Sequence, residues 1–246
     1  MKMPAKPLKL LLRLSITMIS LACMSQYSLA QVRYLPHVTK LDSDYQTWII
    51  LENTTTEDVI FELQPYAETG ARTPSVLGLL TPGEVAICKQ GDLLGHRDAA
   101  YFTIGSDMYP AQGMNVSVAY GLKSEEGSPA YHYEATTASK RYRLYAGNWP
   151  QVFDAIAVVN LGNEPATVRV KHVSLMGDVL QEVVIAEDLA PMAKVATIIG
   201  GYTSVFERSA SPIFEIEATM DVGLMALQGD LPTSRPIWSN PVRAIP

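Results

Sequence analysis

Hydrophobic residues recur at every second position in several short stretches of the chain. In the stretch 59–66, Phe61 and Leu63 fall on one side of an extended strand, and Glu62 and Gln64 fall on the other. This alternation is typical of a β-strand, because successive side chains point to opposite faces. No sustained 3.6-residue periodicity follows residue 30. The pattern predicts an all-β protein.

Gly and Pro residues separate the alternating stretches at intervals of roughly ten to twenty residues, which favours an antiparallel β-sandwich over an α/β fold. In the first half, strands are expected at 47–52, 59–66, 84–88, 101–104 and 115–120, with a short helical turn at 91–96. In the second half they are expected at 155–159, 166–173, 183–185, 194–199, 213–218 and 224–227.

The two halves repeat one pattern. With Asn53 aligned to Asn160, Phe61 and Leu63 meet Val168 and Val170 at an offset of 107 residues. With small shifts the alignment also pairs Glu57 with Glu164, Gly70 with Gly177, Tyr34 with Tyr142, Pro82 with Pro191, Phe102 with Phe214, and Tyr120-Gly121 with Gln228-Gly229. Because the copies agree in the phase of their alternation as well as in spacing, we interpret the repeat as a duplication and not as coincidence.

The repeat predicts two tandem β-sandwich domains, at 31–139 and 140–246, after a signal peptide at 1–30. Each copy is large enough to form its own core. The polar segment 123–129 follows the last strand expected in the first copy. Several tyrosines crowd the connection beyond it, namely Tyr131, Tyr133, Tyr142 and Tyr145. We therefore expect an ordered last strand plus connector instead of a free linker, so the two domains could be held rigidly.

The first 30 residues have the layout of a secretory signal peptide. Lys2, Lys6 and Lys9 precede an apolar run, and Ser28-Leu29-Ala30 ends it as a small-x-small cleavage site. We expect cleavage between Ala30 and Gln31 and a secreted or periplasmic product. The alternatives are an uncleaved membrane anchor, for which the run is short, and lipidation at Cys23, whose preceding residues resemble a lipoprotein box only loosely.

Without its leader, the chain is acidic. Removing three lysines and Arg13 from the 19 basic residues leaves 15, against 25 acidic residues. Nucleic acids and anionic lipids are bound mainly through Lys and Arg, so we expect no nucleic-acid partner. No apolar run after Ala30 is long enough to span a membrane.

The sequence shows no signature of an enzyme, metal or cofactor site. His37, His96, His132 and His172 never fall at metal-ligand spacing with each other or with Cys88. Cys88 lies in an apolar strand-like run without an identifiable base, which indicates a packing role. The glycine loops and catalytic motifs of common enzyme classes are missing from the sequence. We expect a non-catalytic protein.

Aromatic residues are the remaining candidates for binding a ligand. They are Trp149, Trp238, Tyr142 and Tyr145. Their rings could stack on a sugar or a protein partner; the alternative is packing in a core or between the domains. The first copy has no tryptophan that matches Trp149, so a site there would belong to the second domain alone.

Several structural motifs resemble a repeat of exported bacterial proteins. These are Tyr34-Leu35-Pro36-His37-Val38, a strand ending in Asn53, a strand ending near Gly70, the Pro82-Gly83 corner and a strand ending in Tyr120-Gly121. The repeat is similar to immunoglobulin-like sandwich modules, usually without an assigned activity. The resemblance implies that fold in both halves and transfers no functional residue.

Two functions from different classes fit these expectations. The first is an exported, non-catalytic module that binds or scaffolds a protein or glycan through its loops or the seam between domains. The alternative is an assembly factor that resembles the two-domain periplasmic pilus chaperones, which bind client strands at an exposed sheet edge. Those chaperones are commonly basic and have unlike domains, whereas this chain is acidic and duplicated.

Overall fold

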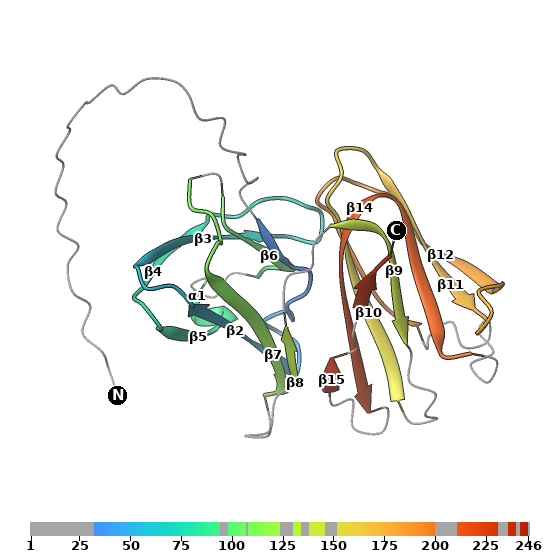
Figure 1. Cartoon of the computed structure of the whole chain (residues 1–246), viewed down its shortest axis with the longest axis horizontal. Coiled ribbons are helices and arrows are strands. Elements are labelled where there is room, and N and C mark those ends of the chain that lie inside the picture. The colour runs from blue at the N-terminus through green and yellow to red at the C-terminus, as the bar shows by residue number, and fades with distance from the viewer. Residues whose placement is uncertain are drawn as a thin grey trace.

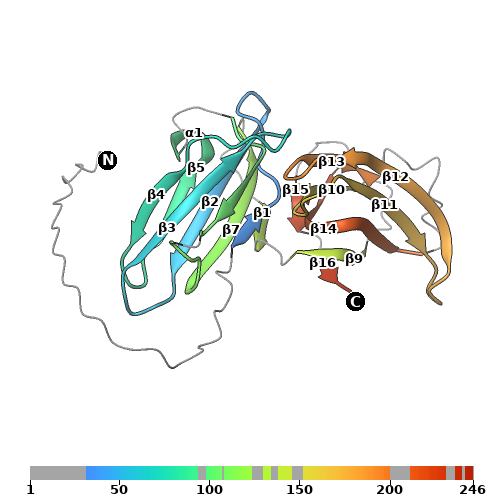
Figure 2. The ribbon, with the colours of Figure 1, turned by 90° about the horizontal axis from the view of Figure 1, so that it is seen from above.

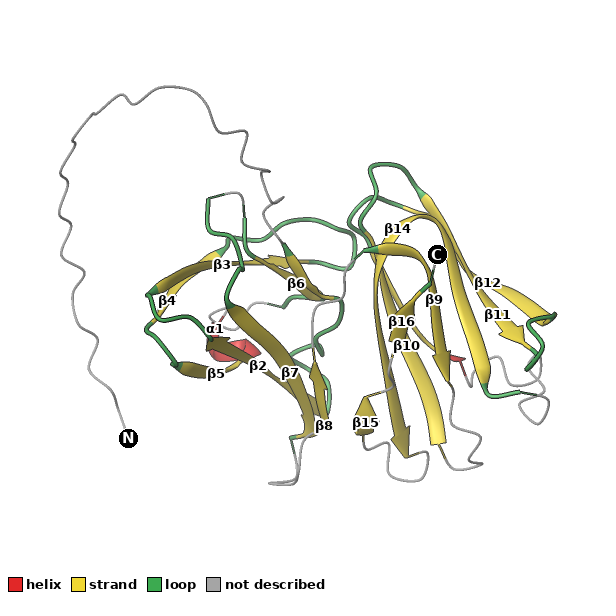
Figure 3. Cartoon of the chain, viewed as in Figure 1, coloured by secondary structure: helices red, strands yellow, loops and turns green. Residues whose placement is uncertain are grey.

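The protein consists almost entirely of antiparallel β-strands (Figures 1 and 3). The computed structural model describes residues 32–93, 98–106, 108–123, 130–133, 138–145, 152–199, 211–230, 236–239 and 242–245. The predicted helical turn at 91–96 corresponds in part to the short helix α1 (Gln90–Leu93). No helix within the described ranges is long and apolar enough to cross a membrane. The prediction of an all-β protein is confirmed.

The N-terminal half contains two four-stranded sheets. One has the order β1-β6-β3-β4, from β1 (Arg33–Leu35), β3 (Val59–Tyr66), β4 (Val76–Leu80) and β6 (Tyr101–Ile104). The other has the order β5-β2-β7-β8, from β2 (Tyr45–Asn53), β5 (Val85–Lys89), β7 (Met114–Leu122) and β8 (Ala130–Tyr133). Ile49 on β2, Leu63 on β3 and Val118 on β7 are fully buried in one core. The two sheets therefore pack face to face.

The C-terminal half is one eight-stranded sheet folded into two layers. Its strands are β9 (Ser139–Tyr145), β10 (Val152–Asn160), β11 (Ala166–Val173), β12 (Val179–Leu189), β13 (Lys194–Ile198), β14 (Ile213–Asp230), β15 (Pro236–Ser239) and β16 (Val242–Ala244). The first part of β14 pairs with β9 and β11, and its second part pairs with β10 and β15. This strand thereby passes from one layer to the other around a shared core.

The same pairing plan occurs in both halves. β1, β2, β3, β4, β5 and β8 have the partners that β9, β10, β11, β12, β13 and β15 have in the second half. The long β14 takes the place of β6 and β7 together. Only β16, paired with β9, has no counterpart among the described strands of the first half. The repeat seen in the sequence is therefore also present in the way the strands pair.

A buried asparagine ends the second strand of each half. The Asn53 Nδ2 donates to the carbonyls of Glu57 at 2.7 Å and Leu80 at 3.0 Å. The Asn160 Nδ2 donates in the same way to Glu164 and Leu189, both at 2.8 Å. Both side chains are 0% exposed. Each amide joins its strand to the next turn and to the end of the fourth strand.

One detail of the internal alignment is wrong. Leu35 and Leu144 are both fully buried and lie opposite equivalent phenylalanines in the neighbouring strand. The offset at these strands is therefore one residue larger than predicted. Tyr34 corresponds to Arg143 and not to Tyr142.

β1, β9, β15 and β16 were not among the expected strands, and two further differences have a physical reason. β4 was not expected, because its sequence Val-Leu-Gly-Leu-Leu lacks alternation and contains Gly78. That glycine lies opposite Phe61, and a Cβ on it would come within 2.3 Å of the Phe61 ring. The strands expected at 213–218 and 224–227 are one continuous strand, because β14 changes partners without a turn. The expected domain boundary after residue 139 falls at the first residue of β9.

We predict that Asn53→Ala lowers the free energy of unfolding by about 2 kcal/mol, because it removes the buried donor to the Leu80 carbonyl and one of the two donors to the Glu57 carbonyl. Urea unfolding of the protein without residues 1–30 measures this loss. Asn115→Ala is the matched control, since the Asn115 amide is exposed and binds one surface carboxylate, that of Glu52. An equal effect of the two substitutions would contradict the structural role of Asn53.

Candidate functional site

A small apolar cluster joins the two halves. It contains Tyr66, Ala100 and Tyr101 from the first half and the buried Val159 from the second, with Leu161 and Met192 packed against it. The rings of Tyr66 and Tyr101 stack with centroids 4.7 Å apart. The Tyr101 hydroxyl donates to the Met192 carbonyl at 2.7 Å. Burial and the neighbouring Tyr66 raise the pKa of Tyr101, so the hydroxyl remains a donor. We call this region of contact the seam.

The backbone of a hairpin reaches across the seam. Residues 67–70 form the tip between β3 and β4, and residues 191–194 form the corner between β12 and β13. The Lys194 amide donates to the Glu68 carbonyl at 2.9 Å. Gly70 has φ of +86°, and a Cβ there would lie 2.7 Å from the Met192 carbonyl carbon. The tip therefore contacts the corner so closely that only glycine fits.

Lys194 is a buried cation at the seam, with 9% of its surface exposed. Its ammonium donates to the Ala100 carbonyl at 2.8 Å and lies 2.7 Å from Nδ1 of His37. Since an ammonium group has no acceptor, the Nδ1 of His37 accepts this bond. Burial, partly offset by nearby Glu68 and assisted to a smaller extent by Lys40, lowers the pKa of Lys194 to about 8.

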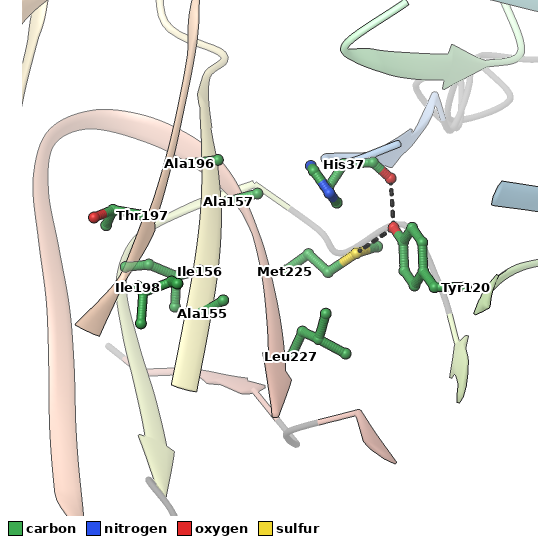
Figure 4. A pocket seen from close by; sticks show the side chains of 10 residues that line it. All are labelled: His37, Tyr120, Ala155, Ile156, Ala157, Ala196, Thr197, Ile198, Met225 and Leu227. Carbon is green, nitrogen blue, oxygen red and sulfur yellow. Dashed lines mark hydrogen bonds between the residues drawn. The ribbon is translucent and has the colours of Figure 1, made fainter. Parts of the chain in front are cut away.

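A second bridge surrounds Tyr120. Its buried hydroxyl donates to the His37 carbonyl at 2.6 Å and lies 3.2 Å from the sulfur of Met225 (Figure 4). Met225 belongs to β14, yet it packs in the core cluster of the N-terminal half. A side chain of the C-terminal half therefore enters the core of the N-terminal half.

An apolar pocket of about 330 Å³ lies beside this bridge (Figure 4). Its lining residues come from both halves: His37, Tyr120, Ala155, Ile156, Ala157, Ala196, Thr197, Ile198, Met225 and Leu227. The volume is in the range of small-molecule sites. However, the pocket offers few polar groups to orient a ligand.

A polar groove of about 380 Å³ lies on the outer face of β1, β6 and β3, at the other side of the seam. It is lined by Val32, Tyr34, Glu62, Gln64, Tyr66, Arg72, Thr103, Gly105, Ser106 and Met192. The Arg72 guanidinium lies 5.9 Å from the centre of the Tyr66 ring. Burial, with a smaller effect of Tyr66, raises the pKa of Tyr34. The groove thus combines aromatic rings with charged and amide groups.

Cross-strand ion pairs occupy the same face in the C-terminal half. Arg143, at the position of Tyr34, binds Glu215, and Lys171, at the position of Gln64, binds Glu217. Arg169, at the position of Glu62, lies 3.3 Å from Glu182. The hydrogen bond from Lys171 is the main cause that lowers the pKa of Glu217. These charges bind each other across adjacent strands.

Of the predicted binding residues, only Tyr142 and Tyr145 have described side chains, and neither is part of the seam. Tyr142 is 1% exposed, and its hydroxyl donates to the Val222 carbonyl, so its ring belongs to the core. Tyr145 is 56% exposed at the end of β9. Trp238 pairs through its backbone in β15, and its side chain lies outside the described set. Trp149 and the cleavage residues Ala30 and Gln31 also lie outside the described residues.

The surroundings of His172 and Cys88 indicate a structural role for each. His172 is fully buried, 2.7 Å from the Ser211 carbonyl, and its ring stacks on Phe214. Burial and nearby Asp92 raise the pKa of Cys88, which is opposite to what activates a thiol nucleophile. The described residues contain no group of three or more potential metal ligands.

Comparison of the chain with protein-family models, with curated proteins and with solved structures found no match. The seam, the apolar pocket and the polar groove are therefore known from their geometry alone.

The residues that form the seam were not among the predicted site residues. A signal for them exists in the internal repeat, because they differ between the copies. Tyr101 and Lys194 align with Ile213 and Val85. Both residues can be found by comparing the aligned copies for positions that are polar in one copy and apolar in the other.

We predict that the stability difference between the wild type and Lys194→Met increases with pH. The pKa of Lys194 is near 8 in the folded chain and ~10.4 when unfolded. Between these values the unfolded chain binds more protons, so raising the pH stabilises the wild type by up to about 3 kcal/mol. Below pH 8 both states are charged, and the difference is constant.

Urea unfolding at several pH values from 7 to 10 measures this difference. Lys89→Met, at an exposed lysine of β5, is the control and should show no such slope. A wild-type-minus-Lys194→Met difference that stays flat over this range would contradict the buried state of Lys194.

Proposed function

We propose that this protein is an exported, non-catalytic binding or scaffolding module that contacts a protein or glycan through the polar groove beside the seam. It consists of two copies of one immunoglobulin-like sandwich unit, at 31–139 and 140–246, and acts in the bacterial envelope or the extracellular space. The leader at 1–30 supports export. The repeated pairing plan and the paired buried asparagines support the duplication.

The difference between the two outer sheet faces is the observation that carries this proposal. The copies share their scaffold, so positions where they differ are the positions free to acquire a separate function. In the C-terminal copy, the face is filled by mutually paired charges. In the N-terminal copy, the equivalent positions hold Tyr34, Glu62 and Gln64 around a groove.

The groove has the chemistry of a site for a polar, extended ligand. Tyrosine rings supply contact area with little loss of conformational entropy. Glu62 can accept hydrogen bonds, and Arg72 can donate several in a planar fork. The amide of Gln64 is held in place by the carbonyls of Pro65 and Thr73. Hydroxyl groups of a sugar, or the backbone and side chains of a peptide, would match these groups.

We predict that Tyr34→Ala or Arg72→Ala weakens ligand binding about tenfold or more, because each removes a contact at the centre of the groove. The probes are an array of defined oligosaccharides and an array of short peptides, tested with the protein without its leader. Arg169→Ala is the matched control in the other copy and should bind as the wild type does. No bound probe of either kind, or binding that both groove variants retain, would refute the proposed site.

A second candidate function is the binding of client strands at a sheet edge, as in a periplasmic assembly chaperone. One observation favours it: β12 is an eleven-residue edge strand with exposed apolar side chains. Val179, Leu180 and Val184 are 53%, 43% and 39% exposed. Uncovered apolar edges readily accept another strand.

Hydrogen exchange distinguishes this second candidate from the first. An apolar extended peptide added as a probe would protect the amides of β12 if it joins the sheet there, and Val184→Lys would abolish that protection. Protection confined to β1 and β3 would instead support the groove.

A further inference from the structure

Each half contains both elements that meet at the seam. The tip at 67–70 has its equivalent at 174–177. Gly70 and Gly177 have φ of +86° and +96°, and their amides donate to Ala67 and Ser174, each at 3.0 Å. The two tips therefore have the same backbone conformation.

The corner at 191–194 likewise has its equivalent at 82–85. Gly83 and Met192 both have positive φ, +70° and +62°. Their amides donate to the carbonyls of Asn53 and Asn160, at 3.1 and 2.8 Å. The equivalent buried residues Asn53 and Asn160 thus hold the two corners in the same shape.

Among the described residues, one tip and one corner are in contact, and the other two are not. The tip at 67–70 contacts the corner at 191–194, so Gly70 has no room for a Cβ. At Gly177 and at Gly83, by contrast, no atom of the described residues lies within 4 Å of an added Cβ. Lys194 is 9% exposed in the occupied corner, whereas its equivalent Val85 is 51% exposed. The tip at 174–177 and the corner at 82–85 are therefore open.

The open tip and corner differ from the occupied tip and corner in the character of their contacting side chains. In the occupied pair, the Lys194 amide binds the Glu68 carbonyl, and the two side chains have opposite charge. The equivalent residues of the open pair are both apolar, Val85 in the corner and Leu175 in the tip. At this pair of positions both partners change together, so the apolar Val85 and Leu175 suit each other as Lys194 and Glu68 do.

Further apolar side chains surround both open surfaces. Leu175 and Met176 are 73% and 91% exposed at the tip, and the predicted binding residue Tyr145 is 56% exposed at the same end of the half. Ile87 is 65% exposed beside the corner. Exposed apolar groups gathered at one place indicate a contact surface.

The two open surfaces lie at opposite ends of the molecule. β4 and β5, which meet at the corner, lie at one end, and the ends of β11 and β12 at the tip lie at the other (Figures 1 and 2). A tip and a corner so placed cannot meet within one chain. They can meet between chains, and the contact then leaves another tip and another corner open.

We propose that a second copy of this chain occupies these surfaces. The tip at 174–177 of one copy docks on the corner at 82–85 of the next, with the geometry of the seam, and the copies join head to tail. The backbone bond from Lys194 to Glu68 is repeated as a bond from Val85 to the Leu175 carbonyl. The side chains of Leu175 and Met176 become buried in this contact.

Sedimentation of the protein without residues 1–30, over a series of concentrations, tests the proposal. We expect the average mass to rise with concentration in the wild type. Leu175→Lys and Val85→Glu should each weaken association about tenfold or more, since each places a charge against an apolar surface. Leu77→Glu is the matched control, because Leu77 is 58% exposed on β4 outside the corner.

Sedimentation of a mixture of the two variants is the decisive part of this experiment. In the mixture, the lysine introduced in the tip of one variant meets the glutamate introduced in the corner of the other as an opposite-charge pair. The remaining tip and corner are unchanged. Association should return to within a few-fold of the wild type, although each variant alone stays monomeric. Circular dichroism checks that both variants are folded.

A wild type that stays monomeric at all concentrations overturns the proposal. So does association that both variants retain, which would assign it to another surface, or a mixture that remains monomeric. Binding of a different protein at the tip without self-association would also count against it.

Discussion

A buried asparagine at the end of the second strand supports most of what is distinctive in this structure. The Asn160 side chain binds the carbonyls of Glu164 and Leu189, and its backbone binds Met192 and Ala193. These bonds hold the corner at 191–194 in the shape on which the first half docks. The seam, with the groove and the pocket on its two sides, therefore depends on a hydrogen-bonding group that has no access to water.

The two copies divide their residues between scaffold and specialisation. Shared positions are buried alternating side chains, the asparagines and the glycines of the tips. The changes between polar and apolar or charged and uncharged residues named above lie on outer faces and at the contact, where Lys194, Tyr101 and Tyr34 have the counterparts Val85, Ile213 and Arg143. The repeated pairing plan serves as an internal reference, and the departures from it indicate where each half contacts something.

Much of the fold could be predicted from the sequence, because burial on one face of a strand leaves a period of two. The alternation at Phe61 and Leu63 and the match of Asn53 with Asn160 indicated the repeat and most of the central strands, but not β1, β9, β15 and β16. β4 could not be predicted, because its glycine is explained only by the Phe61 ring from the neighbouring strand. The site was harder to predict. Tyr142 is of a residue type that is common in binding sites, but it lies in the core. Lysine is normally exposed, so the burial of Lys194 was not expected.

The equivalence of the two corners can be observed directly at single amides. Hydrogen exchange resolved at Lys194 and Val85 compares an occupied corner with an open one in the same molecule. The account predicts that the Lys194 amide is protected at every protein concentration, while the Val85 amide exchanges rapidly in dilute solution and becomes protected as concentration rises. Rapid exchange at Lys194, or protection of Val85 that does not depend on concentration, would contradict it.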